Sequence, residues 1–155
     1  MTRQRIRSAG TLDFGKAVEQ FAESTIERMD QIHRGVVQMV AYKLIYRTPF
    51  GAPHTWQRTP PKDYVPGKAR GNWQTRFEQL PPATVLPIRD AAEAYAEAHD
   101  NSGVAGGVTY MLNSTPYILR LEYEGHSPQA PNGMARRTIA EFQQIVSDAV
   151  REGAK

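Results

Sequence analysis

Apolar residues recur every three or four positions over the first third of the chain. The recurring positions are Phe14, Val18, Phe21, Ile26, Met29, Ile32, Val36, Val40 and Leu44. This spacing predicts an amphipathic helix that begins at Asp13, whose carboxylate can cap the first turn. Pro49 disfavours helical geometry at the preceding residue, so we expect the helix to end near Arg47 or Thr48.

This helix is long for a chain of 155 residues. About thirty residues at 1.5 Å each give a rod of roughly 45 to 50 Å, which is longer than the core of such a domain requires. Glu19, Glu23 and Glu27 lie on its more polar face. Gly35 either allows a neighbouring element to pack closely or marks a slight bend. We expect part of the rod to contact another subunit.

The remaining sequence predicts a small sheet, short helices and long loops. Residues 50–68 are rich in proline and glycine and predict an extended loop insertion. Alternating polar and apolar residues predict strands at 72–80, with one buried face, and at 108–113. We expect further helices at 88–99, 116–122 and 134–150, and loops at 100–107 and 125–133.

These elements together predict an α+β fold with one core. We expect the long N-terminal helix and a C-terminal helix to pack on a small antiparallel sheet, with long loops between the elements. We place this single domain at residues 13–152 and a flexible basic arm at 1–12. In the arm Arg3, Arg5 and Arg7 have no acidic neighbour, so it either attracts phosphate or is a solvated tail.

Composition excludes several kinds of chemistry. The chain has no cysteine, which excludes disulfides, thiolate nucleophiles and cysteine-based zinc sites. It also lacks an apolar run long enough for a secretory signal or a membrane span. The four histidines do not have the spacing of helical metal ligands. His126 and Ser127 are adjacent, but neighbours in sequence usually point apart, and a catalytic triad requires three groups that meet through folding. We therefore expect no membrane partner, no cofactor, no metal and no catalytic residue.

Basic residues occur at several further positions. Arg70 lies near Trp73 in a patch of the kind that can hold single-stranded nucleic acid, although a tryptophan in a strand more often belongs to the core. Arg136 and Arg137 open the last predicted helix, where the helix dipole disfavours cations. They indicate either an external anionic partner or two solvated side chains. The candidate DNA-facing or channel-facing residues are Arg3, Arg5, Arg7, Arg70, Arg136 and Arg137.

Two segments of the chain carry a resemblance to a known family. Residues 116–134 read PYILRLEYEGHSPQAPNGM, and residues 67–74 read GKARGNWQ. These segments resemble the neck and tail-completion proteins of long-tailed bacteriophages, a head-tail joining family that includes the lambda-type minor tail protein Z. The matching C-terminal positions are Asn113, Pro116, Tyr117, Leu121, Glu122, Tyr123, Gly125, His126, Ser127, Gln129, Ala130, Pro131, Gly133 and Met134.

The resemblance implies a structural virion protein and no enzyme. Such proteins are expected to form a homo-oligomeric ring, hexameric to match tail symmetry, that completes the tail and joins it to the head connector. The implied partners are further copies of the chain, head connector or head-closure proteins, the tail terminator or tail tube protein, and passing viral DNA in weak contact. The protein would assemble in the host cytoplasm and remain in the virion.

We expect subunit or partner contacts along the inserted loop and the C-terminal motif. The candidate residues are Phe50, Trp56, Tyr64, Glu122, Tyr123, Gly125, His126, Gln129, Pro131 and Met134. The chain departs from the family pattern by roughly a dozen extra residues before Asp63 and by the additional Glu124. Two alternatives remain: a DNA-binding module that uses the basic arm and the arginine patches, and a hydrolase that uses His126.

Overall fold

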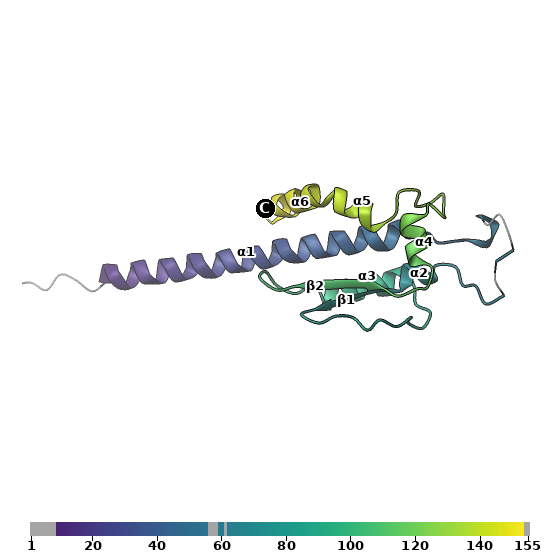
Figure 1. Cartoon of the computed structure of the whole chain (residues 1–155). Helices are drawn as coiled ribbons and strands as arrows, with labels where there is room; N and C mark the ends of the chain where they lie inside the picture. Colours follow the sequence, from purple (N-terminus) through teal and green to yellow (C-terminus); the bar gives the residue numbers. More distant parts are fainter. Residues whose placement is uncertain (1–8, 56–58, 61, 154–155) are drawn as a thin grey trace, which may run out of the picture.

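A helix of 39 residues, α1 (Ala9–Arg47), runs through the molecule, and its N-terminal part projects beyond the other elements (Figure 1). The structure is a computed structural model that describes residues 9–55, 59–60 and 62–153. The helix ends at Arg47, as predicted, but it begins at Ala9. Asp13 therefore lies inside the helix, and the predicted cap is wrong. Residues 9–12 belong to the helix, whereas Arg3, Arg5 and Arg7 lie outside the described residues.

The other elements line the C-terminal half of α1. In chain order they are η1 (Pro53–Thr55), α2 (Lys68–Gly71), β1 (Trp73–Phe77), α3 (Ala91–Asp100), β2 (Thr109–Asn113), α4 (Ile118–Tyr123), α5 (Ala135–Ala140) and α6 (Phe142–Glu152). In Figure 1, α6 runs along one side of α1, and the sheet with α3 runs along the other. The α+β class is confirmed, with the C-terminal helices packed mainly on α1 and not on the sheet.

The sheet consists of β1 and β2 in antiparallel pairing, with Trp73 opposite Asn113 and Phe77 opposite Thr109. The prediction that β1 has one buried face is wrong, because Gln74 is buried as well as its neighbours on both sides. The segment after β1 folds back over the second face of the strand, where Gln74 Nε2 donates a hydrogen bond of 3.0 Å to the Thr84 carbonyl. A polar side chain can be buried here because the loop supplies a backbone partner.

The outer edge of β1 is closed by charged side chains. Glu97 of α3 accepts a hydrogen bond of 2.7 Å from the Thr75 amide, and it forms ion pairs with Arg76 and Arg89. Arg89 also donates to the carbonyl of Trp73. An open strand edge is a template for pairing with another chain. In β1 this edge is occupied by the chain's own side chains.

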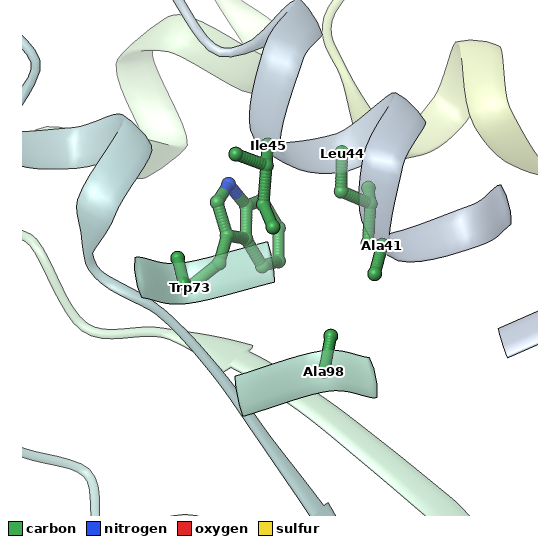
Figure 2. Close-up of a cluster of buried hydrophobic side chains, with 6 residues drawn as sticks. Ala41, Leu44, Ile45, Trp73 and Ala98 are labelled. Atoms are coloured by element: carbon green, nitrogen blue, oxygen red, sulfur yellow. The ribbon is translucent and has the colours of Figure 1, made fainter. Parts of the chain in front are cut away.

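The main core lies between α1, α3 and β1. Its buried members are Ala41, Leu44, Ile45, Trp73, Ala94 and Ala98. The Trp73 ring lies against Ile45, and Ala98 of α3 faces the same space (Figure 2). Trp73 Nε1 donates a hydrogen bond of 2.8 Å to Thr48 Oγ1, just past the end of α1. The prediction that Trp73 is a core residue is therefore confirmed.

The helix boundaries after β1 differ from the prediction for local reasons. α3 begins at Ala91 because Asp90 caps it, in a capping box with Glu93. α4 begins at Ile118, so Pro116 is not its first residue. The predicted continuous C-terminal helix is divided into α5 and α6 at Glu141.

The two C-terminal helices are held to α1 by charge and by close packing. Glu141 accepts hydrogen bonds from Lys43 Nζ at 2.8 Å and from Arg47 Nη2 at 2.7 Å. A Cβ atom at Gly35 would lie 3.5 Å from the Cβ of Ala149 in α6. Close packing of a neighbouring element at Gly35 was one of the two predicted alternatives, and it is the one observed. The other alternative, a bend, is absent because α1 is continuous through Gly35.

We expect the Glu141 contacts to stabilise the fold in a pH-dependent manner. Hydrogen bonds from Lys43 and Arg47 lower the pKa of Glu141 from 4.5 to about 2. Because the pKa in the folded state is depressed, the stabilisation is complete above pH 4.5 and is lost as the pH falls towards about 2. The difference in unfolding free energy between the wild type and Glu141→Gln should therefore shrink on acidification.

Urea denaturation at neutral pH and at about pH 3 measures this difference. Glu152→Gln is the matched control, since Glu152 is exposed at the end of α6 and forms no ion pair with any described residue. A Glu141→Gln effect that stays constant or grows at low pH would contradict the assignment.

Candidate functional site

The C-terminal motif forms a closed loop between α4 and α5, fastened by Glu122. Glu122 is buried, and its carboxylate accepts hydrogen bonds from the amides of Met134 at 2.7 Å, Ala135 at 2.9 Å and Arg136 at 2.9 Å. These are the otherwise unpaired amides at the start of α5. Burial raises the pKa of Glu122, but the three amides and the Arg136 side chain outweigh burial and lower that pKa overall.

Other residues of the motif shape and anchor the same loop. Gly133 has a φ of 76°, and a Cβ there would lie 2.5 Å from the Glu122 carbonyl oxygen, so only glycine fits. Leu121, Ala130 and Met134 form a second buried cluster with Ala69 of α2. The motif therefore holds α4 and the start of α5 against α2.

The predicted contact residues fall into two groups. Glu122 and Met134 are buried within the subunit, and Gln129 Oε1 accepts a hydrogen bond of 2.9 Å from the Phe50 amide. These three make internal contacts, and Glu122 and Met134 offer no surface to a partner. The exposed group on the motif loop comprises Tyr123, Gly125, His126 and Pro131.

The inserted loop is held partly by its own residues. Phe50 is partly exposed, and Tyr64 donates a hydrogen bond of 3.3 Å from its hydroxyl to the Phe50 carbonyl. The guanidinium of Arg70 lies 5.5 Å from the centre of the Phe50 ring. Trp56 lies outside the described residues.

The described arginines of the candidate DNA-facing set have partners inside the subunit. Arg136 Nε lies 3.3 Å from Glu122 Oε1, and its guanidinium stacks over the Tyr123 ring at 5.1 Å. Arg136 therefore has a negatively charged partner within the subunit, and an external anion at this position stays a prediction. Arg137 lies 3.6 Å from Glu141, and Arg70 Nε donates a hydrogen bond of 2.9 Å to the Thr48 carbonyl.

The outer half of α1 has an apolar face with no other described element against it. All side chains from residue 13 to residue 29 are exposed, including Phe14 at 71% and Phe21 at 73%. We call the row Phe14, Val18, Phe21, Ile26 and Met29 the bare stripe. Each phenylalanine ring has roughly 150 to 250 Å² of surface, of which about 70% is exposed here. At about 25 cal/mol per Å², covering the exposed part of either ring would be worth about 3 to 4 kcal/mol.

The bare stripe continues the face on which α6 packs. A Cβ at Gly153, just past α6, would lie 3.0 Å from Ile32 Cγ1, so α6 ends beside Ile32. N-terminal to Ile32 the same face continues without a neighbouring helix (Figure 1). Sequence spacing located this helix, and its length led us to expect that part of it contacts another subunit, which stays a prediction. Spacing did not show which of its apolar residues the fold would leave exposed.

A hollow of about 560 Å³ lies at the opposite end of α1. Its apolar wall includes Tyr46, Phe50 and Ile88, and Arg70 supplies a cation. Arg70 forms no ion pair with any described carboxylate, and burial lowers its pKa. We refer to this feature as the α1–α3 hollow.

The described part of the chain holds no group of three histidine, cysteine or acidic residues that could bind a metal ion. His126 is exposed on the motif loop. His33 Nε2 instead lies 3.1 Å from the Ser102 carbonyl oxygen, where it connects α1 to the turn after α3. Within the described ranges, no helix is both long and apolar enough to cross a membrane.

Replacement of Glu122 tests whether its hydrogen bonds to the start of α5, which we call the motif clamp, stabilise the fold. Glu122→Gln should destabilise the fold by about 1 to 3 kcal/mol, because an amide cannot accept all the hydrogen bonds that a buried carboxylate accepts here. Chemical denaturation measures the loss. The neighbouring Glu124→Gln, at an exposed position, should change stability by less than about 0.5 kcal/mol. Equal effects of the two replacements would show that the clamp is unimportant.

Amide hydrogen exchange tests whether the outer half of α1 lacks tertiary protection. In isolated subunits, residues 13–29 should exchange on the order of a hundredfold faster than residues 37–47, because packing protects only the inner half. The like-charged pairs Glu19–Glu23 and Glu23–Glu27, each four residues apart, further weaken the outer half. Uniform protection along α1 in a monomer would contradict this account.

Comparison with protein-family models, with curated proteins and with solved structures found no match. The interpretation of the site therefore depends on the chain's own residues. Its two distinctive surfaces are the bare stripe and the exposed side of the motif loop.

Proposed function

We propose that this chain is a structural virion protein of a long-tailed bacteriophage. In this proposal it forms a ring at the head–tail junction, completes the tail and joins the tail to the head connector. The bare stripe is the observation that carries the proposal. A helix that extends past its own core and leaves two phenylalanines about 70% exposed is suited to burial against another subunit.

The organisation of the motif supports the same proposal. Glu122, Gly133 and Met134 act inside the subunit, and they hold the loop in one conformation. The rigid loop then presents Tyr123 and His126 at its surface. A fixed loop with an exposed aromatic side chain is a suitable contact element for an assembly protein.

A ring requires that each subunit use two different, complementary surfaces. We propose a hexamer, with the head connector or head-closure proteins on one side and the tail terminator or tail tube protein on the other. The protein would assemble in the host cytoplasm and remain in the virion. Viral DNA would pass the ring in weak contact.

The DNA-binding alternative receives less support from the described residues. Arg136 already pairs with Glu122, and Arg137 lies beside Glu141. A hydrolase centred on His126 also receives no support, since His126 is exposed and forms no hydrogen bond with any described residue. An assembly role accounts for the bare stripe and for the exposed side chains of the motif loop, which neither alternative explains.

Reconstitution of head–tail joining tests the proposal. Heads and tails from cells infected with the encoding phage, with this gene inactivated, should remain separate until purified protein is added. Phe14→Glu combined with Phe21→Glu should lower the yield of joined particles at least tenfold, because the charges prevent burial of the bare stripe. Electron microscopy counts the joined particles.

The control carries two new charges on the opposite face of the same helix. Gln20→Glu combined with Gln31→Glu should join particles like the wild type, since both residues are exposed and lie away from the stripe. If heads and tails join equally well without this chain, the proposed function is wrong.

A further inference from the structure

We propose that β2 of one copy pairs antiparallel with β2 of a second copy, about a twofold axis at Tyr110. The pairing would extend the two-stranded sheet into a four-stranded sheet shared by two subunits. The proposal depends on the backbone groups at the outer edge of β2, which is the edge that faces away from β1. It goes beyond the proposed function, because it names a contact that a ring does not require.

The hydrogen-bond pattern of the sheet shows which backbone groups of β2 point outward. The Glu78 amide donates a hydrogen bond of 2.8 Å to the Val108 carbonyl, one step past the end of the β1–β2 ladder. In an antiparallel pair, such hydrogen-bonded positions alternate with positions whose N–H and C=O groups point away from the neighbouring strand. The backbone of Tyr110 therefore bonds to β1, whereas the backbone groups of Thr109 and Met111 point to the outer edge.

The outward groups of β1 have partners, and those of β2 do not. On β1 the Thr75 amide donates to Glu97, and the Thr75 carbonyl accepts a hydrogen bond from Arg76. Within the described ranges, the backbone amides and carbonyls of Thr109 and Met111 have no hydrogen-bond partner. β1 is also the only described element with which β2 has extensive contacts. Backbone groups without a partner in the subunit must bond to water or to another chain, so this edge is open.

β2 lacks the features by which edge strands usually avoid pairing. Charged side chains, prolines and bulges protect the edges of natural sheets. The sequence of β2, TYMLN, contains no charged residue and no proline. Its register with β1 runs one residue to one residue without a bulge. A sheet of two strands is also marginal in water, and further strands stabilise it.

The occupant of an open strand edge must itself be an extended strand with unpaired backbone groups. Among the described residues β1 and β2 are the only strands, and the outer edge of β1 is closed by Glu97 and Arg89. The matching strand is therefore β2 of a second copy. Because β2 carries no charge, this pairing places no like charges opposite each other.

One register satisfies the open groups and also pairs the apolar side chains. With Thr109 opposite Met111 of the second copy, and Met111 opposite Thr109, each open amide and carbonyl of these residues gains a partner. Tyr110 then lies opposite Tyr110 of the second copy, in a position where side chains approach closely. Val108 lies opposite Leu112 on the same face. Tyr110 and Val108 are exposed in the subunit, so the pairing would cover both.

The twofold pairing differs in symmetry from the contacts of the proposed ring. A twofold axis turns the second copy over, whereas all subunits of a cyclic ring face the same way. The pairing therefore belongs to free subunits before they enter a ring. Its surface is β2, which is separate from the bare stripe.

Exchange of charge at Tyr110 tests the pairing. Tyr110→Lys and Tyr110→Glu each place like charges opposite each other at the twofold axis, so each should weaken dimer formation at least tenfold. An equimolar mixture of the two variants should form dimers again, because opposite charges then meet. Analytical ultracentrifugation of the wild type, of each variant and of the mixture measures the dimer fraction.

Amide hydrogen exchange measured by NMR locates the contact on β2. In the wild-type dimer the amides of Thr109 and Met111 should exchange at least tenfold more slowly than in monomeric Tyr110→Lys. The Leu112 amide points to β1 and serves as the internal control, since its protection should not depend on the dimer. Leu119→Lys changes an exposed residue of α4 and should dimerise like the wild type. Circular dichroism should show that every variant is folded.

Three results would overturn the inference: a wild type that stays monomeric, variants at Tyr110 that dimerise like the wild type, or a mixture that forms no dimers. Protection of Thr109 and Met111 only after addition of another virion protein would assign the edge to that protein and would also overturn it. Head–tail joining does not enter this test. A dimer of protein that never joins heads to tails supports the pairing and counts only against the proposed function.

Discussion

The packing of other elements on the inner half of α1 is the constraint on which the rest of the structure depends. α3 and β1 cover one side of it through Trp73 and two alanines of α3, and α6 covers the other beside Gly35. The end of α1 is fixed to the sheet by the hydrogen bond from Trp73 to Thr48. Because each layer is attached to this segment, the core uses less than half of the helix.

The shortness of α6 explains why the remaining half is bare. The face of α1 that packs on α6 continues towards the N-terminus with the same three- and four-residue spacing. α6 ends beside Ile32, so Phe14, Val18 and Phe21 have no neighbour from the described residues. An apolar helix face needs burial to contribute stability. The unburied apolar face gives the outer half of α1 little stability of its own. The same face would be suitable for burial against another subunit.

Periodicity predicted the elements well, because spacing along the chain reports which residues share a face. The long helix, both strands and the motif loop lie where the sequence placed them. Contacts between distant segments could not be predicted in this way. Gln74 is buried because a returning loop supplies Thr84, and Glu122 is an internal cap because α5 begins thirteen residues later at its carboxylate. Periodicity also cannot show where α6 stops covering α1.

These contacts divide the residues of the chain into those that stabilise the subunit and those that stay exposed. Several residues that carry the family resemblance stabilise the fold of the subunit itself. Glu122, Gly133 and Met134 are buried and hold the motif loop in place. The exposed apolar surfaces are instead the bare stripe, on the part of α1 that extends past the core, and the α1–α3 hollow at the other end of that helix. The exposed outer half of α1 is joined through one continuous helix to the packed inner half. Burial of the bare stripe would therefore require no movement of the core.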